Sequence, residues 1–186
     1  MTDHQDIFYH FSPAVLISNF VPLVVIFSDK EKAKETHFEY KMWNVLTVVA
    51  DDFSYENKDL VQTLINNVAE EYECEEHIYL YGNNMGGHWA ILYAVLCNAN
   101  AVYSNTPYIK LASKKNDLST LLNNKDSFPI FYLCHNSTII ENNELVYFVD
   151  ACNKYEIKVN LNFCPDLESD TKQHIQKVLD MFERMV

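Results

Sequence analysis

The stretch Tyr79-Leu80-Tyr81-Gly82-Asn83-Asn84-Met85-Gly86-Gly87-His88-Trp89 decides the fold of this chain. It contains all three glycines among the 186 residues. Glycine is favoured where the backbone turns sharply or where two segments approach closely, because it has no Cβ. Elsewhere the chain makes its turns with Asn, Asp, Ser and Pro. The need for glycine is therefore confined to residues 82–87, which we call the glycine turn.

The flanks of the glycine turn predict a strand before it and a helix after it. Residues 77–81 form a short run of β-prone side chains. Residues 88–96 have the length of a helix and are too apolar for an exposed one. A strand, a glycine-containing turn and a buried helix occur together in phosphate-binding loops and in the turn that presents a catalytic nucleophile. A third interpretation is a tight connection that carries no site.

The phosphate-binding patterns fail on detail. The pattern GxGxxG needs a glycine at position 84, and a P-loop needs a closing Gly-Lys-Ser/Thr, which is absent. The nucleophile pattern Gly-x-Ser-x-Gly-Gly fits at Gly82, Gly86 and Gly87, and it puts Asn84 where the serine should be. Asparagine tolerates the positive φ of such a turn, but an amide is not a nucleophile. We therefore expect Asn84 to allow the turn to form but not to act as a nucleophile.

The rest of the chain alternates strand-like and helix-like segments. Apolar runs predict strands at residues 21–27, 44–50, 77–81, 101–104 and 128–135, and residues 157–163 alternate as an edge strand does. Helices are expected at 58–72, 86–97, 144–155 and 170–185, a helix and loop at 111–124, and a hairpin or extended lead-in at 7–20. This order predicts an α/β fold with a doubly wound, mostly parallel sheet of about six strands, in a single domain over residues 1–186.

Composition excludes several classes of function. The net charge of −12, without a basic stripe, argues against nucleic acid and anionic lipid as partners. No apolar run approaches the roughly 18 residues of a spanning helix, so no membrane insertion is expected. The five cysteines form no CxxC pair, and Cys97 and Cys134 lie in apolar runs, where a free cysteine acts as a small hydrophobe. With the acidic residues 1–6, this predicts a reduced, cytoplasmic protein; no spaced ligand set predicts a metal or cofactor.

The chain resembles the α/β-hydrolase superfamily over residues 21–185. The strongest part is residues 79–107, where the glycine turn and the apolar helix are followed by Ala101-Val102-Tyr103-Ser104-Asn105-Thr106-Pro107. This part looks like short bacterial members linked to surface polysaccharides, including capsule O-acetyltransferases and related capsule-biosynthesis proteins. The resemblance implies a minimal α/β-hydrolase-like fold.

The resemblance also implies roles for single residues. The family's chain order is nucleophile, acid, base, and Asn84 takes the nucleophile position. His174, at the start of the last helix, takes the position of the base, although surface histidines are common on helices. No Asp follows the preceding strand closely, which leaves Glu141 as a late candidate for the acid. The oxyanion hole would use the N–H of Met85 and the loop after the first core strand, where Ser28 could add a hydroxyl.

Two hypotheses for function follow, and a weaker third. The leading one is a degenerate hydrolase with a non-catalytic binding or accessory role, whose ligand is a small acyl or glycan group or a partner protein. The competing one is an active serine-type esterase or O-acyltransferase, with Asn84 an inactivating substitution of serine or with another nucleophile. Ser104 and Cys134 are disfavoured as that nucleophile, because neither lies in a turn that would present it to His174. The third hypothesis is a structural interaction protein.

Overall fold

The computed structural model describes residues 7–15, 21–28, 40–49, 57–109, 118–123, 127–136, 143–164 and 172–185. These residues form a seven-stranded sheet in the order β1-β3-β2-β4-β5-β6-β7. The strands are β1 (Tyr9–Ser12), β2 (Leu23–Ser28), β3 (Asn44–Val49), β4 (Ile78–Asn83), β5 (Ala101–Asn105), β6 (Ile130–His135) and β7 (Val159–Phe163). The predicted α/β fold with a mostly parallel sheet is confirmed.

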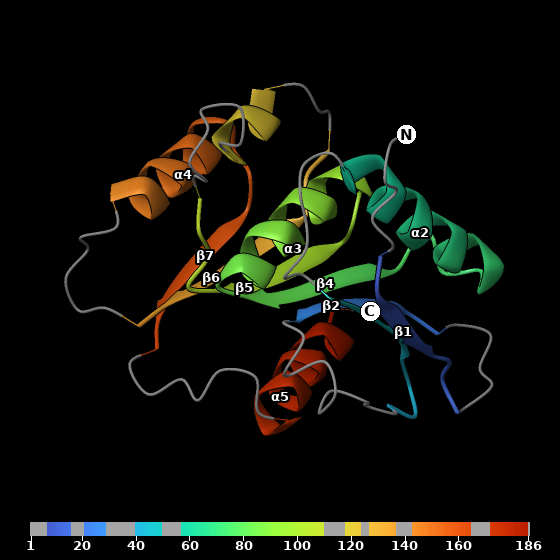
Figure 1. Ribbon diagram of the computed structural model, residues 1–186. Coiled ribbons are helices and arrows are strands. Elements are labelled where there is room, and N and C mark those ends of the chain that lie inside the picture. The colour runs from blue at the N-terminus through green and yellow to red at the C-terminus, as the bar shows by residue number, and fades with distance from the viewer. Residues whose placement is uncertain are drawn as a thin grey trace.

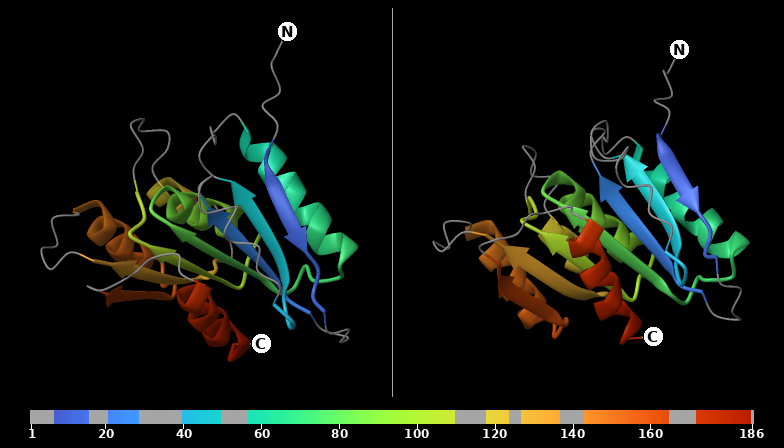
Figure 2. Two further views of the ribbon diagram at one scale, coloured as in Figure 1. Left: turned by 60° about the horizontal axis from the view of Figure 1, so that its bottom comes forward. Right: turned by 90° about the horizontal axis from the view of Figure 1, so that it is seen from below.

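Helices cover both faces of the sheet (Figures 1 and 2). One face carries α2 (Lys58–Glu71), α3 (Met85–Leu96) and α4 (Asn143–Lys154), while α5 (Lys172–Glu183) is the one described helix on the other. The short 3-10 helix η3 (Leu118–Asn123) contacts α3 and α4. The helices on the two faces make the sheet doubly wound.

The edge strand β1 lies in the segment for which the sequence predicted either a hairpin or an extended lead-in. It pairs antiparallel with β3, with Tyr9 opposite Val48 and Ser12 opposite Val45. All the other described pairs are parallel. The described part of the lead-in, residues 7–15, thus contributes one strand that joins a distant partner, which raises the described sheet from the expected six strands to seven.

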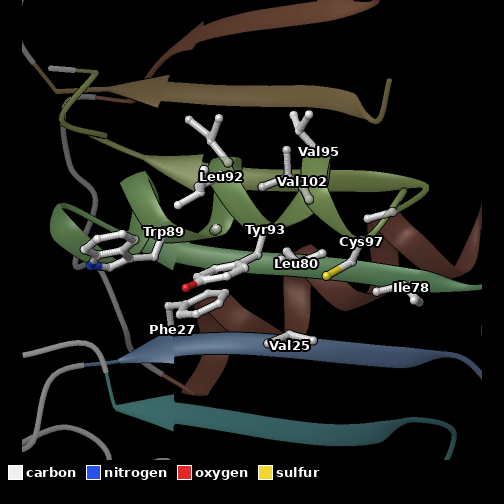
Figure 3. Packing of buried hydrophobic residues seen from close by; sticks show 14 of the residues in the cluster. Val25, Phe27, Ile78, Leu80, Trp89, Leu92, Tyr93, Val95, Cys97 and Val102 are labelled. Carbon is white, nitrogen blue, oxygen red and sulfur yellow. The ribbon is translucent and has the colours of Figure 1, made fainter. Parts of the chain in front are cut away.

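The first core lies between the sheet and α3. Residues 86–95 of α3 are all buried, which explains why this helix lacks a polar face. Figure 3 shows Val25, Phe27 and Leu80 of the sheet facing Tyr93 of α3. The rings of Phe27 and Tyr93 are stacked, with centroids 5.4 Å apart and planes 10° apart. Such a stacked pair contributes about 0.5–1.5 kcal/mol to stability beyond the contribution of its buried area.

The second core lies between the sheet and α5. Phe182 of α5 packs on Tyr79 of β4, with ring centroids 4.9 Å apart, and Trp43 meets Tyr79 edge-on at 5.3 Å. The indole N–H of Trp43 donates to a carboxylate oxygen of Glu183 at 3.1 Å. These contacts fix α5, and with it His174 in its first turn, against one face of the sheet.

One expectation about the cysteines is wrong. Cys134 is not a free core thiol, because it forms a disulfide with Cys164. The parallel register of β6 and β7 puts Cys134 opposite Asn162, so that Cys164 lies just past the end of β7, and the spacing of 30 residues did not reveal this. The described free cysteines, Cys74, Cys97 and Cys152, are buried. Among the described helices, none has both the length and the apolar character needed to cross a bilayer.

Candidate functional site

The glycine turn lies where the winding of the sheet reverses direction. The chain passes from β2 to β3 on one side and then returns to β4 on the other side of β2. Open α/β sheets bind their ligands beyond the carboxyl ends of the strands at such a point. Residues 82–87 connect the carboxyl end of β4 to the first turn of α3, so they are the first candidate for a site.

All three glycines serve close approach of backbone segments. A Cβ at Gly82 would overlap the carbonyl group of Gly86, and one at Gly86 would lie 2.5 Å from the carbonyl oxygen of Phe27. A Cβ at Gly87 would lie 2.5 Å from Oγ of Ser104. None of the three has a positive φ. The glycines therefore allow α3 to touch the ends of β2, β4 and β5.

The strained residue of the turn is Asn84. Its backbone has φ 49° and ψ −114°, and its side chain is exposed. A non-glycine residue in such a sparsely populated region carries about 1–3 kcal/mol of strain. Two hydrogen bonds hold it: its N–H donates to the carbonyl of Asn105 at 2.9 Å, and its own carbonyl accepts from the N–H of His88 at 3.2 Å. The turn thus presents the Asn84 side chain at a fixed place above β4 and β5.

Thr106, directly after β5, fixes that side chain. Its hydroxyl lies 2.5 Å from Oδ1 of Asn84, to which it donates, and 3.3 Å from Oδ1 of Asn83. Its own φ is 44°, unusual for a β-branched residue, and its N–H donates to the carbonyl of Cys134 at 2.7 Å. Thr106 was not among the site residues predicted from the sequence. The parallel pairing of β4 with β5, which puts Asn83 opposite Asn105, is the feature that could have located it.

His174 packs on the face of the sheet that α5 covers. Its ring packs on Tyr103 and Tyr81, with centroids 5.5 Å and 6.0 Å away. Both tyrosines belong to the face that α5 covers. Within the described part of the chain no hydrogen bond joins His174 to Asn84, and the partner of the Asn84 side chain is Thr106. The assignment of His174 as the base therefore stays a prediction.

A second histidine near the turn is structural. His88, in the first turn of α3, is fully buried, and its Nδ1–H donates to the carbonyl of Tyr108 at 2.6 Å. Its ring also meets Trp89 edge-on at 5.1 Å. Burial lowers the pKa of His88, which the hydrogen bond to the Tyr108 carbonyl opposes only in part. The neutral imidazole is thus favoured at this position.

The other predicted site residues fall into different surroundings. Met85 opens α3 and is half-exposed, whereas Ser28 ends β2 and is buried. Glu141 lies outside the residues that the structure describes, so its assignment as the acid stays a prediction, as do the oxyanion-hole assignments. Of the two other nucleophiles considered, Ser104 is fully buried and Cys134 is in a disulfide. Within the described ranges no three His, Cys, Asp or Glu side chains gather as a metal site would need.

Solved structures share the fold of this chain over almost its whole length. An esterase from Thermogutta terrifontis, in a structure with butyrate bound, matches with a TM-score of 0.65 and 12% identity, over 99% of this chain and 90% of that one. The capsule O-acetyltransferase of Neisseria meningitidis serogroup A matches with a TM-score of 0.67 and 14% identity, over 93% and 89% of the two chains. The fold is that of the α/β-hydrolases.

Larger enzymes contain the same α/β-hydrolase fold as one part. Dipeptidyl peptidase 4 of Porphyromonas gingivalis matches with a TM-score of 0.70 and 9% identity, over 95% of this chain, which spans only 33% of that protein. No family model and no curated protein matches the sequence. At such low identities the likeness establishes the α/β-hydrolase fold, and the chemistry has to be argued from the residues of this chain.

Proposed function

We propose that this protein is a degenerate α/β-hydrolase that binds a ligand without hydrolysing it. The observation that carries the proposal is Asn84, an amide at the strained position between β4 and α3 where a hydrolase has its serine. Its Oδ1 accepts a hydrogen bond from Thr106. We regard the glycine turn as a nucleophile elbow that has kept its backbone and lost its nucleophile.

The chemistry of the amide supports a non-catalytic role. A serine hydrolase needs a hydroxyl that a neighbouring histidine can deprotonate, whereas a carboxamide offers no such group. His174 packs on Tyr81 and Tyr103, with no hydrogen bond to Asn84 within the described residues. Removal of triad members in serine proteases leaves a residual acceleration of about 10³ to 10⁴ over water. Such an acceleration is too small for useful turnover of a stable ester.

The proposed ligand is a small acyl or glycan group, with a partner protein as the other option. The esterase with bound butyrate and the capsule O-acetyltransferase share the fold of this chain, and this likeness supports an acyl or glycan ligand. The proposed setting is an accessory step in bacterial surface-polysaccharide biosynthesis. Neither nucleic acid nor a membrane is part of the proposal, in keeping with the net charge of −12.

The proposed location is the cytoplasm, as the sequence predicts. Disulfides are rare there, so this location predicts that Cys134 and Cys164 are thiols in the living cell, even though they are bonded in this structure. Alkylation of thiols at the moment of lysis, followed by mass spectrometry, measures their state. A bonded pair in that experiment would argue for an oxidising compartment instead.

Hydrolysis of p-nitrophenyl butyrate tests the proposed loss of activity. We expect the chain as given to show no turnover beyond the residual acceleration of about 10³ to 10⁴ over water that a site without its triad can keep. Asn84→Ser restores the hydroxyl at the turn, and activity that appears only in this variant would support descent from an active hydrolase. Loss of that activity on a further His174→Ala change would identify the base.

The competing function, an active esterase or O-acyltransferase, predicts the opposite result. Robust hydrolysis by the chain with Asn84 intact would establish another nucleophile and would overturn the proposal. Inactivity of both the chain as given and the Asn84→Ser variant would leave a binding protein whose remaining triad positions are also lost.

A further inference from the structure

We infer that Asn84 is a hydrogen-bond donor that binds the acceptor oxygen of an acyl group, either a carboxylate or an amide-type carbonyl. The inference deepens the proposed function and rests on it, because a side chain that binds the ligand by donating hydrogen bonds stands here in place of an attacking nucleophile. It changes the role of the residue from a lost nucleophile to a ligand-binding group.

The first step is the orientation of the amide. A carboxamide carries one acceptor oxygen and one NH₂ group with two donor hydrogens. The hydroxyl of Thr106 donates to Oδ1 of Asn84 at 2.5 Å, so the oxygen faces Thr106 and the NH₂ group is directed away from it. No described residue accepts a hydrogen bond from this NH₂ group, and the Asn84 side chain is exposed. Two donors are therefore available to a ligand.

The second step is that these donors are held in place before any ligand arrives. The backbone of Asn84 is fixed through the carbonyl of Asn105 and the N–H of His88, and Thr106 fixes the side chain. Thr106 is in turn held by its N–H, which donates to the carbonyl of Cys134. A preorganised donor loses little conformational entropy on binding, so even a small ligand can be retained.

The third step is the chemistry of the neighbouring backbone. Asn84 is the N-cap of α3, and its side chain makes no capping hydrogen bond. The first N–H groups of a helix lack partners within the helix, and the helix dipole favours negative charge at that end. The two NH₂ donors of Asn84 therefore lie at a helix end that favours negative charge. This set of donors selects an oxygen with lone pairs and partial or full negative charge.

Butyrate and butyramide are the probes that separate the two sources of such an oxygen. They have the same chain length, and one carries a carboxylate while the other carries a neutral carbonyl. Titration into ¹⁵N-labelled protein reports on the side-chain NH₂ signals of asparagine by NMR. The pair of signals from Asn84 is assigned by its absence from the Asn84→Asp spectrum. We expect this pair to shift on titration with at least one probe.

Two matched substitutions test whether the donors carry the binding. Asn84→Asp keeps the size of the side chain and tolerates a positive φ, but it replaces the NH₂ donors with an acceptor oxygen. We expect binding at least about 10-fold weaker, as for the loss of one good hydrogen bond. Thr106→Val removes the hydroxyl that orients the amide and should weaken binding by about 3-fold or more, whereas Thr106→Ser retains it. Circular dichroism and thermal melting identify any variant that fails to fold.

The outcomes separate this inference from the proposed function. Binding of either probe that depends on Asn84 and on the Thr106 hydroxyl supports the inference, and the better probe identifies the source of the oxygen. Absence of binding in an inactive chain, or binding that Asn84→Asp leaves unchanged, overturns the inference alone. Ester hydrolysis by the chain as given overturns the proposed function, and the inference with it.

Discussion

Asn84 has a positive φ, which few residues other than glycine adopt, and asparagine is one of the residues enriched at positive φ. Serine hydrolases need both this backbone and a side chain that can attack, so the two requirements normally coincide at one residue. Here only the backbone requirement is met. The hydrogen bond from Thr106 gives the amide a defined orientation, which a side chain with no remaining role would not need.

At the residue scale, the close contact of Gly87 with Ser104 predicts a coupled pair of substitutions. Gly87→Ala brings a methyl group to about the position that lies 2.5 Å from Oγ of Ser104, and overpacking of this kind costs about 1–3 kcal/mol. The Ser104 hydroxyl is buried without a hydrogen-bond partner among the described residues, so Ser104→Ala should be neutral or stabilising by about 1 kcal/mol. In the Ser104→Ala background the cost of Gly87→Ala should fall by about 1 kcal/mol or more.

Urea unfolding of the four proteins in this cycle measures the coupling. Gly82→Ala is the matched control, since its Cβ would overlap the backbone of Gly86, which no side-chain truncation relieves. Equal costs of Gly87→Ala in both backgrounds would contradict the proposed contact.

His88 predicts a pH dependence of stability. Burial lowers its pKa in the folded state below the ordinary value, so the unfolded chain binds the proton more readily. The contribution of His88 is therefore complete above about pH 6.5 and falls with pH below it, by up to about 1.4 kcal/mol per pH unit, until the folded-state pKa is reached. The free energy of unfolding of the native chain, compared with His88→Gln between pH 5 and 8, measures this. A difference between the two proteins that stays constant over this range would rule out the effect.

At the element scale, local patterns were enough to predict most strands and helices. The strands and helices around the glycine turn begin and end within a few residues of their expected places, because buried parallel strands are apolar runs and α3 is apolar throughout. Residues 111–124 were expected to be a helix and loop, and their described part is the 3-10 helix η3. Local patterns thus predict elements that are stabilised by their own burial.

Features that depend on contacts between distant segments were not predicted. The pairing of β1 with β3, the disulfide between Cys134 and Cys164, and the hydrogen bond from Thr106 to Asn84 all depend on strand register. Register is set by the packed sheet and leaves little trace in the order of residues along one strand. The candidate site was therefore predicted at its turn and incompletely at its neighbours.

The helix α5 predicts a clear contrast between two aromatic residues. Phe182 is fully buried against Tyr79 and Trp43, so Phe182→Ala should lower the free energy of unfolding by about 3–5 kcal/mol. Tyr147 of α4 is 65% exposed, and Tyr147→Ala should change the free energy of unfolding by no more than about 0.5 kcal/mol. Thermal or urea unfolding measures both. Similar small effects at the two positions would mean that α5 does not hold the second core together.

At the scale of the whole molecule, the α/β-hydrolase fold and the catalytic chemistry are separable. The sheet, its reversal of winding beside β2 and the glycine turn are all present. Solved structures with this fold include a peptidase, an esterase and an O-acetyltransferase, so the fold alone selects none of these activities. Whether this chain is catalytic therefore depends on the side chain at the glycine turn, which is the amide of Asn84.

The central claim is that the protein has no activated nucleophile. Mass spectrometry of the intact protein after treatment with a fluorophosphonate tests this claim most directly, because the reagent phosphonylates an activated serine hydroxyl. The account predicts no adduct on the chain as given, whatever the incubation time. A stoichiometric adduct on the chain with Asn84 intact would contradict it, since an activated nucleophile would then exist elsewhere in the molecule.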